Sequence, residues 1–232
     1  PIALLTYNSA STDYGFELNK NSLFKKELFN FSKNLHESFY NVGNINNSVR
    51  QLSHYAGSFS IGSKNLENLL VNNNLVEFGG GSGINSLLNS YICKKKIYLY
   101  DLPSMIMMQE KIHKNYNLYN QNNVGCSEII FKDNYQELKD SIKNEKYCFV
   151  SYFAFTETPL ELRDKFFDIL YNSVFIIFAS NPAFEGVDNK QYFYELNKRL
   201  SNKFHYEIID FPDRFKNWKP DHKYHIFIRK SH

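Results

Sequence analysis

The fold is decided by the stretch Leu75-Val76-Glu77-Phe78-Gly79-Gly80-Gly81-Ser82-Gly83. A short apolar run carries one carboxylate and then breaks into glycines, which allow a tight turn and a close approach of backbone to a ligand. Apolar residues then return at the i, i+3, i+4, i+7 spacing of a helix face, at Ile84, Leu87, Leu88 and Tyr91. The stretch therefore predicts a strand, a glycine turn and a helix whose first N–H groups can bind a ligand.

The position of the carboxylate separates two ligand classes that use such a turn. A dinucleotide fingerprint, G-x-G-x-x-G, needs a third glycine where this chain has Ile84. Glu77 lies before the turn, where it would repel a pyrophosphate but attract the ammonium of a methionine moiety. The stretch resembles motif I of the class I S-adenosylmethionine (SAM) methyltransferases, E-x-G-x-G-x-G, through Glu77, Gly79, Gly81 and Gly83. A glycine turn without a ligand is the plainer alternative, because short glycine motifs are weak signals.

The rest of the chain alternates between apolar runs and amphipathic segments, which predicts strands separated by helices. Strands are expected at residues 75–78, 96–100, 127–132, 147–155 and 173–179, and then at 205–211 and 222–230. The helix beginning at Pro103 is expected to pack through Met105, Met108, Ile112 and Tyr116. A loop of about ten residues joins the last two strands, which suits an antiparallel hairpin. We therefore expect an α/β, Rossmann-like fold with the seven-stranded sheet of the methyltransferases, its last strand antiparallel.

Residues 1–65 differ from this pattern because they are rich in Asn, Ser and Gly. A helix capped by Ser22 is expected there, with an apolar face formed by Phe24, Leu28, Phe31 and Leu35. A core of this size would not fold alone. The sequence thus predicts an N-terminal helical cap or lid over residues 1–65 and a SAM-binding Rossmann-like domain over residues 66–232.

The composition is that of an ordinary globular protein, with 22% charged and 43% hydrophobic residues among 232. A net charge of +3 without a clustered basic face is too small to indicate nucleic-acid binding. Cys93, Cys126 and Cys148 lack metal-ligand spacing and are expected to be reduced thiols of a cytoplasmic protein. Neither a signal peptide nor an 18-residue apolar stretch is recognisable, so no membrane span is expected. No metal is expected, and a homodimer remains open.

The remaining cofactor ligands are expected at the carboxyl ends of the strands, where open α/β sheets bind their ligands. Asp101, followed by Leu102, ends the second strand and could accept hydrogen bonds from both ribose hydroxyls. Asp133 or Asn134, after the third strand, could meet the adenine amino group. Gly79, Gly80, Gly81 and Gly83 would let the backbone approach the cofactor. Alternatively, Asp101 caps the helix that begins at Pro103, and Asp133 has a purely structural role.

Four residues are candidates for the acceptor side. Glu157 follows the fourth strand and could remove a proton from an acceptor hydroxyl or bind it, although a carboxylate at a helix N-terminus also has a purely electrostatic role. His222 opens the last strand, whose start lies at the ligand edge if that strand is antiparallel. His225 points to the opposite face. His54, in the N-terminal segment, is the third candidate base; any one of these histidines is more often structural than catalytic.

A closer likeness appears at Asp101-Leu102-Pro103, followed after five intervening residues by Gln109. This resembles the D-L-P-x-x-x-x-x-Q signature of a bacterial sugar O-methyltransferase family, over roughly residues 70–180. That family often has a serine and then Glu-Met after strand four, where this chain has Thr156-Glu157-Thr158. The resemblance implies O-methylation of a sugar hydroxyl, on a nucleotide-linked precursor or a unit of a surface polysaccharide such as capsule or lipooligosaccharide. Because Thr158 replaces the Met of that family, the resemblance does not define the acceptor pocket.

Other functions remain as alternatives, including methylation of another small molecule and a non-catalytic SAM-binding role. The segment Asn181-Pro182-Ala183-Phe184 is similar to the N-P-P-Y/F motif of nucleic-acid amino-methyltransferases, but it follows the fifth strand and not the fourth. An NAD-dependent oxidoreductase of the short-chain type would need a Tyr-x-x-x-Lys pair, and the residue four after Tyr192 is Leu196.

Overall fold

The computed structural model describes residues 66–81, 83, 85–86, 89–90, 93–119, 128–210 and 221–230. The expected N-terminal cap, including Ser22 and His54, lies outside these residues. So do Ser82, Cys126 and the expected helix face of Ile84, Leu87, Leu88 and Tyr91. The division into a cap and a SAM-binding domain therefore stays a prediction.

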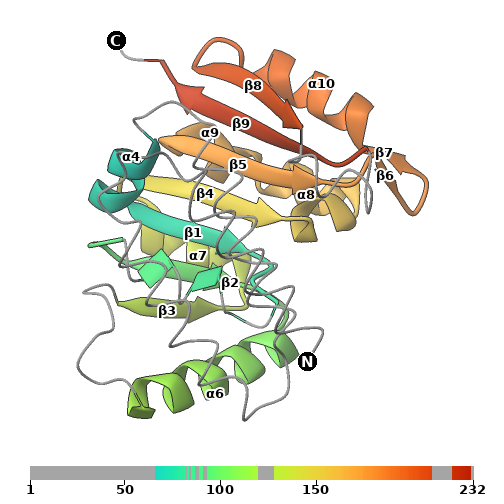
Figure 1. Cartoon of the computed structure of the whole chain (residues 1–232). Helices are drawn as coiled ribbons and strands as arrows, with labels where there is room; N and C mark the ends of the chain where they lie inside the picture. Colours follow the sequence, from blue (N-terminus) through green and yellow to red (C-terminus); the bar gives the residue numbers. More distant parts are fainter. Residues whose placement is uncertain are drawn as a thin grey trace, which may run out of the picture.

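Seven strands form one sheet in the described part of the chain (Figure 1). They are β1 (Asn74–Phe78), β2 (Ile97–Tyr100), β3 (Ile129–Lys132), β4 (Tyr147–Tyr152), β5 (Phe175–Ser180), β8 (Phe204–Asp210) and β9 (Lys223–Arg229). Their order is β3-β2-β1-β4-β5-β9-β8. Neighbouring strands from β3 to β5 are parallel, while β9 runs antiparallel to both β5 and β8. The expected sheet, with its antiparallel last strand, is confirmed.

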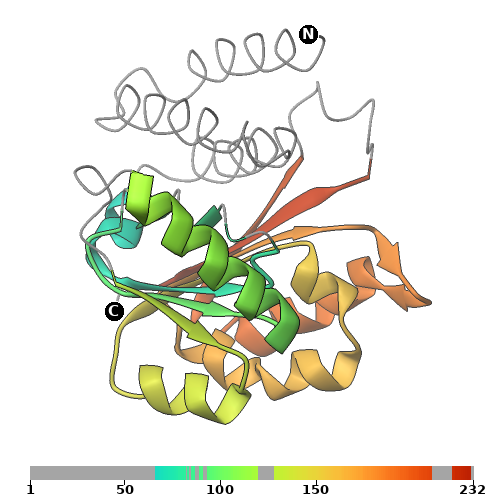
Figure 2. The same ribbon diagram turned by 90° about the horizontal axis from the view of Figure 1, so that it is seen from below.

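Helices cover both faces of the sheet (Figure 2). One face carries α7 (Tyr135–Ile142), α8 (Leu160–Lys165), α9 (Phe167–Asn172) and α10 (Asn189–Leu200). The other carries α4 (Leu66–Asn72) and α6 (Pro103–Tyr119). Because side chains alternate along a strand, β1 sends Val76 into the core beneath α7, α9 and α10 and sends Leu75 into the core beneath α4. Glu77 therefore lies on the same face as Leu75, next to the turn that follows.

Two local features differ from expectation. The fourth strand ends at Tyr152, three residues earlier than expected, because Phe153 adopts a positive φ of 71° that turns the chain into the short 3₁₀ helix η1 (Ala154–Glu157). After β5, the strands β6 (Ala183–Phe184) and β7 (Val187–Asp188) form a small hairpin. Its two loop residues, Glu185 and Gly186, both have positive φ, as tight hairpin turns require.

The prediction of which face of α6 packs against the sheet is wrong. Met108 is 39% exposed, and Met105 and Ile112 are only half-buried, while the side chain of Tyr116 lies outside the described residues. The buried face is instead formed by Ile106, Gln109 and His113. The reason is that this helix packs beside a polar glycine turn as well as the sheet, so polar side chains face inward. None of the described helices is long and apolar enough to cross a membrane.

Candidate functional site

The carboxyl ends of β1, β2, β4 and β5 and the start of β9 lie at one edge of the sheet, and the candidate residues gather there. Glu77 in β1 is only 2% exposed. Its Oε1 accepts a hydrogen bond from Asn85 Nδ2 at 3.0 Å, whereas no described residue donates to Oε2. Burial, and to a smaller extent the charge of Asp101, raises the pKa of Glu77 to about 8, against the lowering effect of Asn85. A buried carboxylate with an unpartnered oxygen is a strong site for a cationic ligand.

The glycines of the turn are needed for different reasons. A Cβ on Gly79 would lie 2.0 Å from Ala154 Cβ, so Gly79 lets β1 pass close to η1. A Cβ on Gly83 would lie 2.8 Å from His113 Nε2, so Gly83 lets the turn pack against α6. At Gly81 no atom of the described residues lies within 4 Å of an added Cβ, although its φ of 57° still favours glycine. Gly81 is thus the turn position with space for a ligand beside it.

Asp101 contacts the glycine turn directly. Its Oδ2 accepts hydrogen bonds from the Gly81 N–H at 3.2 Å and from Gln109 Nε2 at 2.8 Å, and its Oδ1 accepts one from the Leu102 N–H at 2.8 Å. Asp101 does not cap α6. A capping side chain would accept from N–H groups inside the first turn of that helix, whereas Asp101 accepts from Leu102, which precedes the helix. The Leu102 side chain is 68% exposed at the same edge.

Asp133 and Asn134 follow β3, and the structure separates their roles. Asn134 caps α7, with its Oδ1 accepting from the N–H groups of Gln136 at 2.8 Å and Glu137 at 3.2 Å. Asp133 is exposed. Tyr100 pairs with Lys132 across β2 and β3, so Asp101 and Asp133 each follow one residue of this pair. Burial, and then the charges of Asp133 and Asp101, raise the pKa of Tyr100. Of the two alternatives for adenine, Asp133 is the one whose side chain is not used as a cap.

Glu157 lies in η1 and is exposed, with its Oε1 accepting from Asn181 Nδ2 at 2.6 Å. This bond ties the segment after β4 to the segment after β5. Behind it, the buried Arg163 donates to the carbonyls of Thr156 at 2.7 Å and Thr158 at 2.9 Å, and to Asn189 Oδ1 at 2.7 Å. The backbone on both sides of Glu157 is therefore held in place by hydrogen bonds from Arg163.

The two candidate histidines that the structure describes, His222 and His225, have different surroundings. His222 is half-buried just before β9, with its ring 5.3 Å from that of Phe153, at the same edge as Glu157. His225 lies on the opposite face, where its Nε2 bonds Ser180 Oγ at 2.9 Å and its Nδ1 bonds Tyr206 OH at 2.7 Å. Burial, and then the charge of Lys223, lowers the pKa of His225 to about 3. His225 is therefore a core residue, whereas His222 remains a candidate.

Sequence reasoning missed Asn85, Gln109 and His113 as parts of the site; Gln109 was recognised only as a letter of a signature. The described residues that follow the turn, Asn85, Ser86, Asn89 and Ser90, are helical and buried. This is a polar buried face, which an apolar periodicity cannot find. The only available signal was polar residues repeated at helical spacing.

Known proteins were compared with the chain at three levels. No protein-family model matches it, and no curated protein sequence does. Many solved structures do. The small RNA methyltransferase HEN1 matches with a TM-score of 0.54 and 14% identity, over 79% of this chain and 25% of that one. The methyltransferase domain of bacterial CtHen1-C matches with a TM-score of 0.53 and 8% identity, over 78% of this chain and 98% of that one. A candidate methyltransferase from Streptococcus mutans, in complex with S-adenosylhomocysteine (SAH), matches with a TM-score of 0.51 and 12% identity, over 71% of this chain and 95% of that one.

The fold is that of the SAM-dependent methyltransferases. At such low identities the likeness concerns the methyltransferase fold and not the acceptor. The fit of the cofactor is judged on this chain's own residues. Glu77 Oε2 suits the cofactor's ammonium, Gly81 leaves space beside the turn, and Asp101 lies at the end of β2. The described residues contain no group of three or more His, Cys, Asp or Glu side chains placed to hold a metal ion.

Proposed function

We propose that this chain is a SAM-dependent methyltransferase that acts on a hydroxyl group of a carbohydrate. The observation that carries the first part is Glu77, a buried carboxylate beside a glycine turn with one oxygen that no described residue satisfies. A dinucleotide would place a pyrophosphate next to Glu77, where the ligand's negative charge would repel the ionised carboxylate. A methionine ammonium would give it a charge-assisted hydrogen bond.

The residues divide into a cofactor side and an acceptor side. SAM supplies a methyl group on a positively charged sulfur, and transfer to a hydroxyl is a direct displacement that depends mainly on alignment. Glu77 would hold the ammonium, Asp101 the ribose and Asp133 the adenine amino group. Glu157 would accept the proton of the acceptor hydroxyl, which is otherwise a poor nucleophile. His222, at the same edge, is the second candidate base.

A carbohydrate acceptor, such as a nucleotide-linked sugar or a unit of a surface polysaccharide, is supported by two features. The residues of the D-L-P-x-x-x-x-x-Q signature meet in space, since Gln109 Nε2 donates to Asp101 Oδ2. From the described residues, Glu157 accepts a hydrogen bond through Oε1 and none through Oε2, which leaves Oε2 for a hydroxyl. A nucleic-acid acceptor is disfavoured because Asn181, the first residue of the N-P-P-Y/F-like segment, is engaged in holding Glu157.

Calorimetry tests the cofactor. The wild-type chain is expected to bind SAH and SAM and to give no heat with NADH. Asp101→Ala should weaken SAH binding by about 10- to 100-fold, because the hydrogen bonds of a charged acceptor contribute about 1.5–3 kcal/mol. Binding of NADH in place of SAH would overturn the proposal.

Methyl transfer tests the acceptor. With labelled SAM, transfer to nucleotide sugars or oligosaccharides is expected to exceed transfer to RNA. Glu157→Gln should lower the rate by about 10²- to 10⁴-fold, as expected for loss of a general base, with the SAH dissociation constant unchanged. Glu161→Gln, the same exchange at an exposed position of α8, is the matched control. A fully active Glu157→Gln variant would exclude Glu157 as the base, and labelling of RNA alone would exclude a sugar acceptor.

A further inference from the structure

We propose that Gln109 is a positioning residue for the cofactor's ribose, which fixes the Asp101 carboxylate against the glycine turn so that a single oxygen faces the ligand. The proposal rests on the proposed function, since it concerns how the same site holds SAM. It goes beyond the general role of a carboxylate after β2 because it assigns a task to a residue of α6.

The contacts form a closed triangle. Gln109 Nε2 donates to Asp101 Oδ2 at 2.8 Å and to the Gly81 carbonyl at 2.9 Å, and the Gly81 N–H donates to the same Oδ2 at 3.2 Å. Gln109 is fully buried, and its Oε1 accepts no hydrogen bond from the described residues. Within the described part of the chain the amide is therefore held through its NH₂ group alone, and that group joins the helix, the turn and the carboxylate.

This triangle limits what Asp101 can offer to a ligand. Each carboxylate oxygen accepts about two hydrogen bonds. Oδ2 already accepts two, from Gly81 and Gln109, while Oδ1 accepts one from the Leu102 N–H. One acceptor position on Oδ1 remains. With Gln109 in place, Asp101 thus binds one ribose hydroxyl and not both, and Gln109 decides in which direction that oxygen points.

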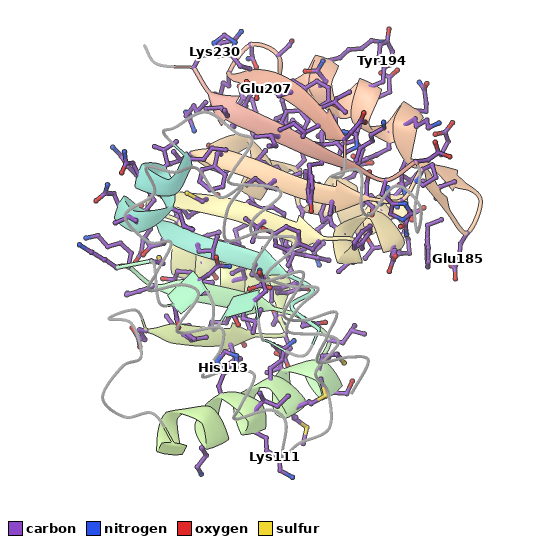
Figure 3. All side chains as sticks on the ribbon, viewed as in Figure 1. Lys111, His113, Glu185, Tyr194, Glu207 and Lys230 are labelled. Carbon is purple, nitrogen blue, oxygen red and sulfur yellow. The ribbon has the colours of Figure 1, made fainter. Side chains whose placement is uncertain are left out.

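A second contact from α6 holds the far end of the turn. His113 follows Gln109 by one helical turn, and Figure 3 shows it directed from α6 toward the sheet while Lys111 points away. Its Nε2 lies 2.8 Å from the Gly83 carbonyl, which can only accept, so Nε2 carries the proton. A Cβ at Gly83 would lie 2.8 Å from His113 Nε2 and 3.2 Å from Gln109 Cγ. The turn is therefore packed directly on both side chains, and its geometry is fixed before a ligand binds.

The test uses two ligands that differ in one moiety. 5′-Methylthioadenosine keeps the ribose of SAH but lacks its amino-acid part. Gln109→Met keeps the length of the side chain and removes the NH₂ donor. Because Gln109 acts on the ribose, this variant should bind both ligands about 10-fold more weakly, by roughly the loss of one charge-assisted hydrogen bond. Gln191→Met, the same exchange on the exposed side of α10, should bind both as the wild type does.

A double-mutant cycle separates positioning from mere stability. In the Asp101→Ala background, Gln109→Met should have no further effect on either dissociation constant, because the carboxylate that it orients is gone. Equal losses in both backgrounds, or no loss in either, would overturn the proposal. If Gln109→Met does not fold, Gln109→Glu replaces it. Its binding of 5′-methylthioadenosine should be weak at pH 8 and recover as the pH falls, because a protonated carboxyl again donates to Asp101. A wild-type chain that fails to bind SAH would instead contradict the proposed function.

Discussion

Glu77→Gln is expected to weaken SAH binding about 100-fold and to abolish the dependence of that binding on pH. The variant replaces a carboxylate, which can form a charge-assisted hydrogen bond with the ligand's ammonium, by a neutral amide of the same shape, and such bonds contribute about 1.5–3 kcal/mol. Calorimetry with SAH measures the effect. 5′-Methylthioadenosine, which has no ammonium, is the control ligand and should bind both proteins equally.

The direction of the pH dependence follows from the raised pKa of Glu77, about 8 in the free protein. Below that pH the carboxyl group is mostly protonated, and binding of a cation must first release the proton. The SAH dissociation constant should therefore fall as the pH rises from 6 to 8, by at most about tenfold per pH unit, and then level off. An affinity that does not change with pH in the wild type would contradict this role for Glu77.

Glu77 also affects the stability of the free protein: a higher pH favours SAH binding but lowers the free energy of unfolding. Since the folded-state pKa of about 8 lies above the ordinary value of 4.5, the folded free protein holds this proton more tightly than the unfolded chain does. The contribution of Glu77 to stability is present at low pH and is lost as the pH rises through that window, at up to about 1.4 kcal/mol per unit. The free energy of unfolding, measured with urea, should fall between pH 5 and pH 8 in the wild type, and Glu77→Gln should lack the part of this fall that comes from Glu77.

Gly79→Ala and Gly81→Ala are expected to separate folding from binding. At Gly79 the added methyl group would lie 2.0 Å from Ala154 Cβ, at a φ of 70°, so the free energy of unfolding should fall by about 3 kcal/mol or more. At Gly81 the added methyl group would meet no atom of the described part of the chain within 4 Å, so the cost should be only the roughly 1–2 kcal/mol of a left-handed alanine. There the methyl group instead occupies the side open to a ligand, and SAH binding should fall at least tenfold.

Urea unfolding gives the two stabilities, and calorimetry of the folded variants gives the affinities. Equal destabilisation by the two substitutions would show that the contact between β1 and η1 is looser than the structure has it. Unchanged SAH binding by Gly81→Ala would show that the ligand does not approach the turn at that residue.

Much of the fold was predictable because the strands are short apolar runs separated by amphipathic helices. The antiparallel β9 followed from two strand patterns with no helix between them. The early end of β4 was not predictable, because Phe153 takes a φ of 71° that no local pattern signals in a bulky residue. The hairpin of β6 and β7 is likewise too short to show a period of two.

The candidate site likewise contains residues that the sequence predicted and residues that it missed. Glu77, the glycines and Asp101 were found because they are adjacent to strand ends, and their meeting follows from parallel strands. Gln109 and His113 were not found, since they reach the turn from a separate helix and lie beside the face of Met105, Met108, Ile112 and Tyr116 that was expected to pack. Their roles depend on hydrogen bonds between residues 28 and 30 positions apart in sequence, which periodicity does not encode.

The antiparallel strand β9 also has a consequence for biosynthesis. Among the described strands, β8 pairs only with β9, and β5 pairs with β9 on the side away from β4. A ribosome therefore makes β9 only after both of its neighbours in the sheet have been made. Until β9 has emerged, the nascent protein carries unpaired strand edges at β5 and β8, and such edges are the segments most prone to pair with other chains.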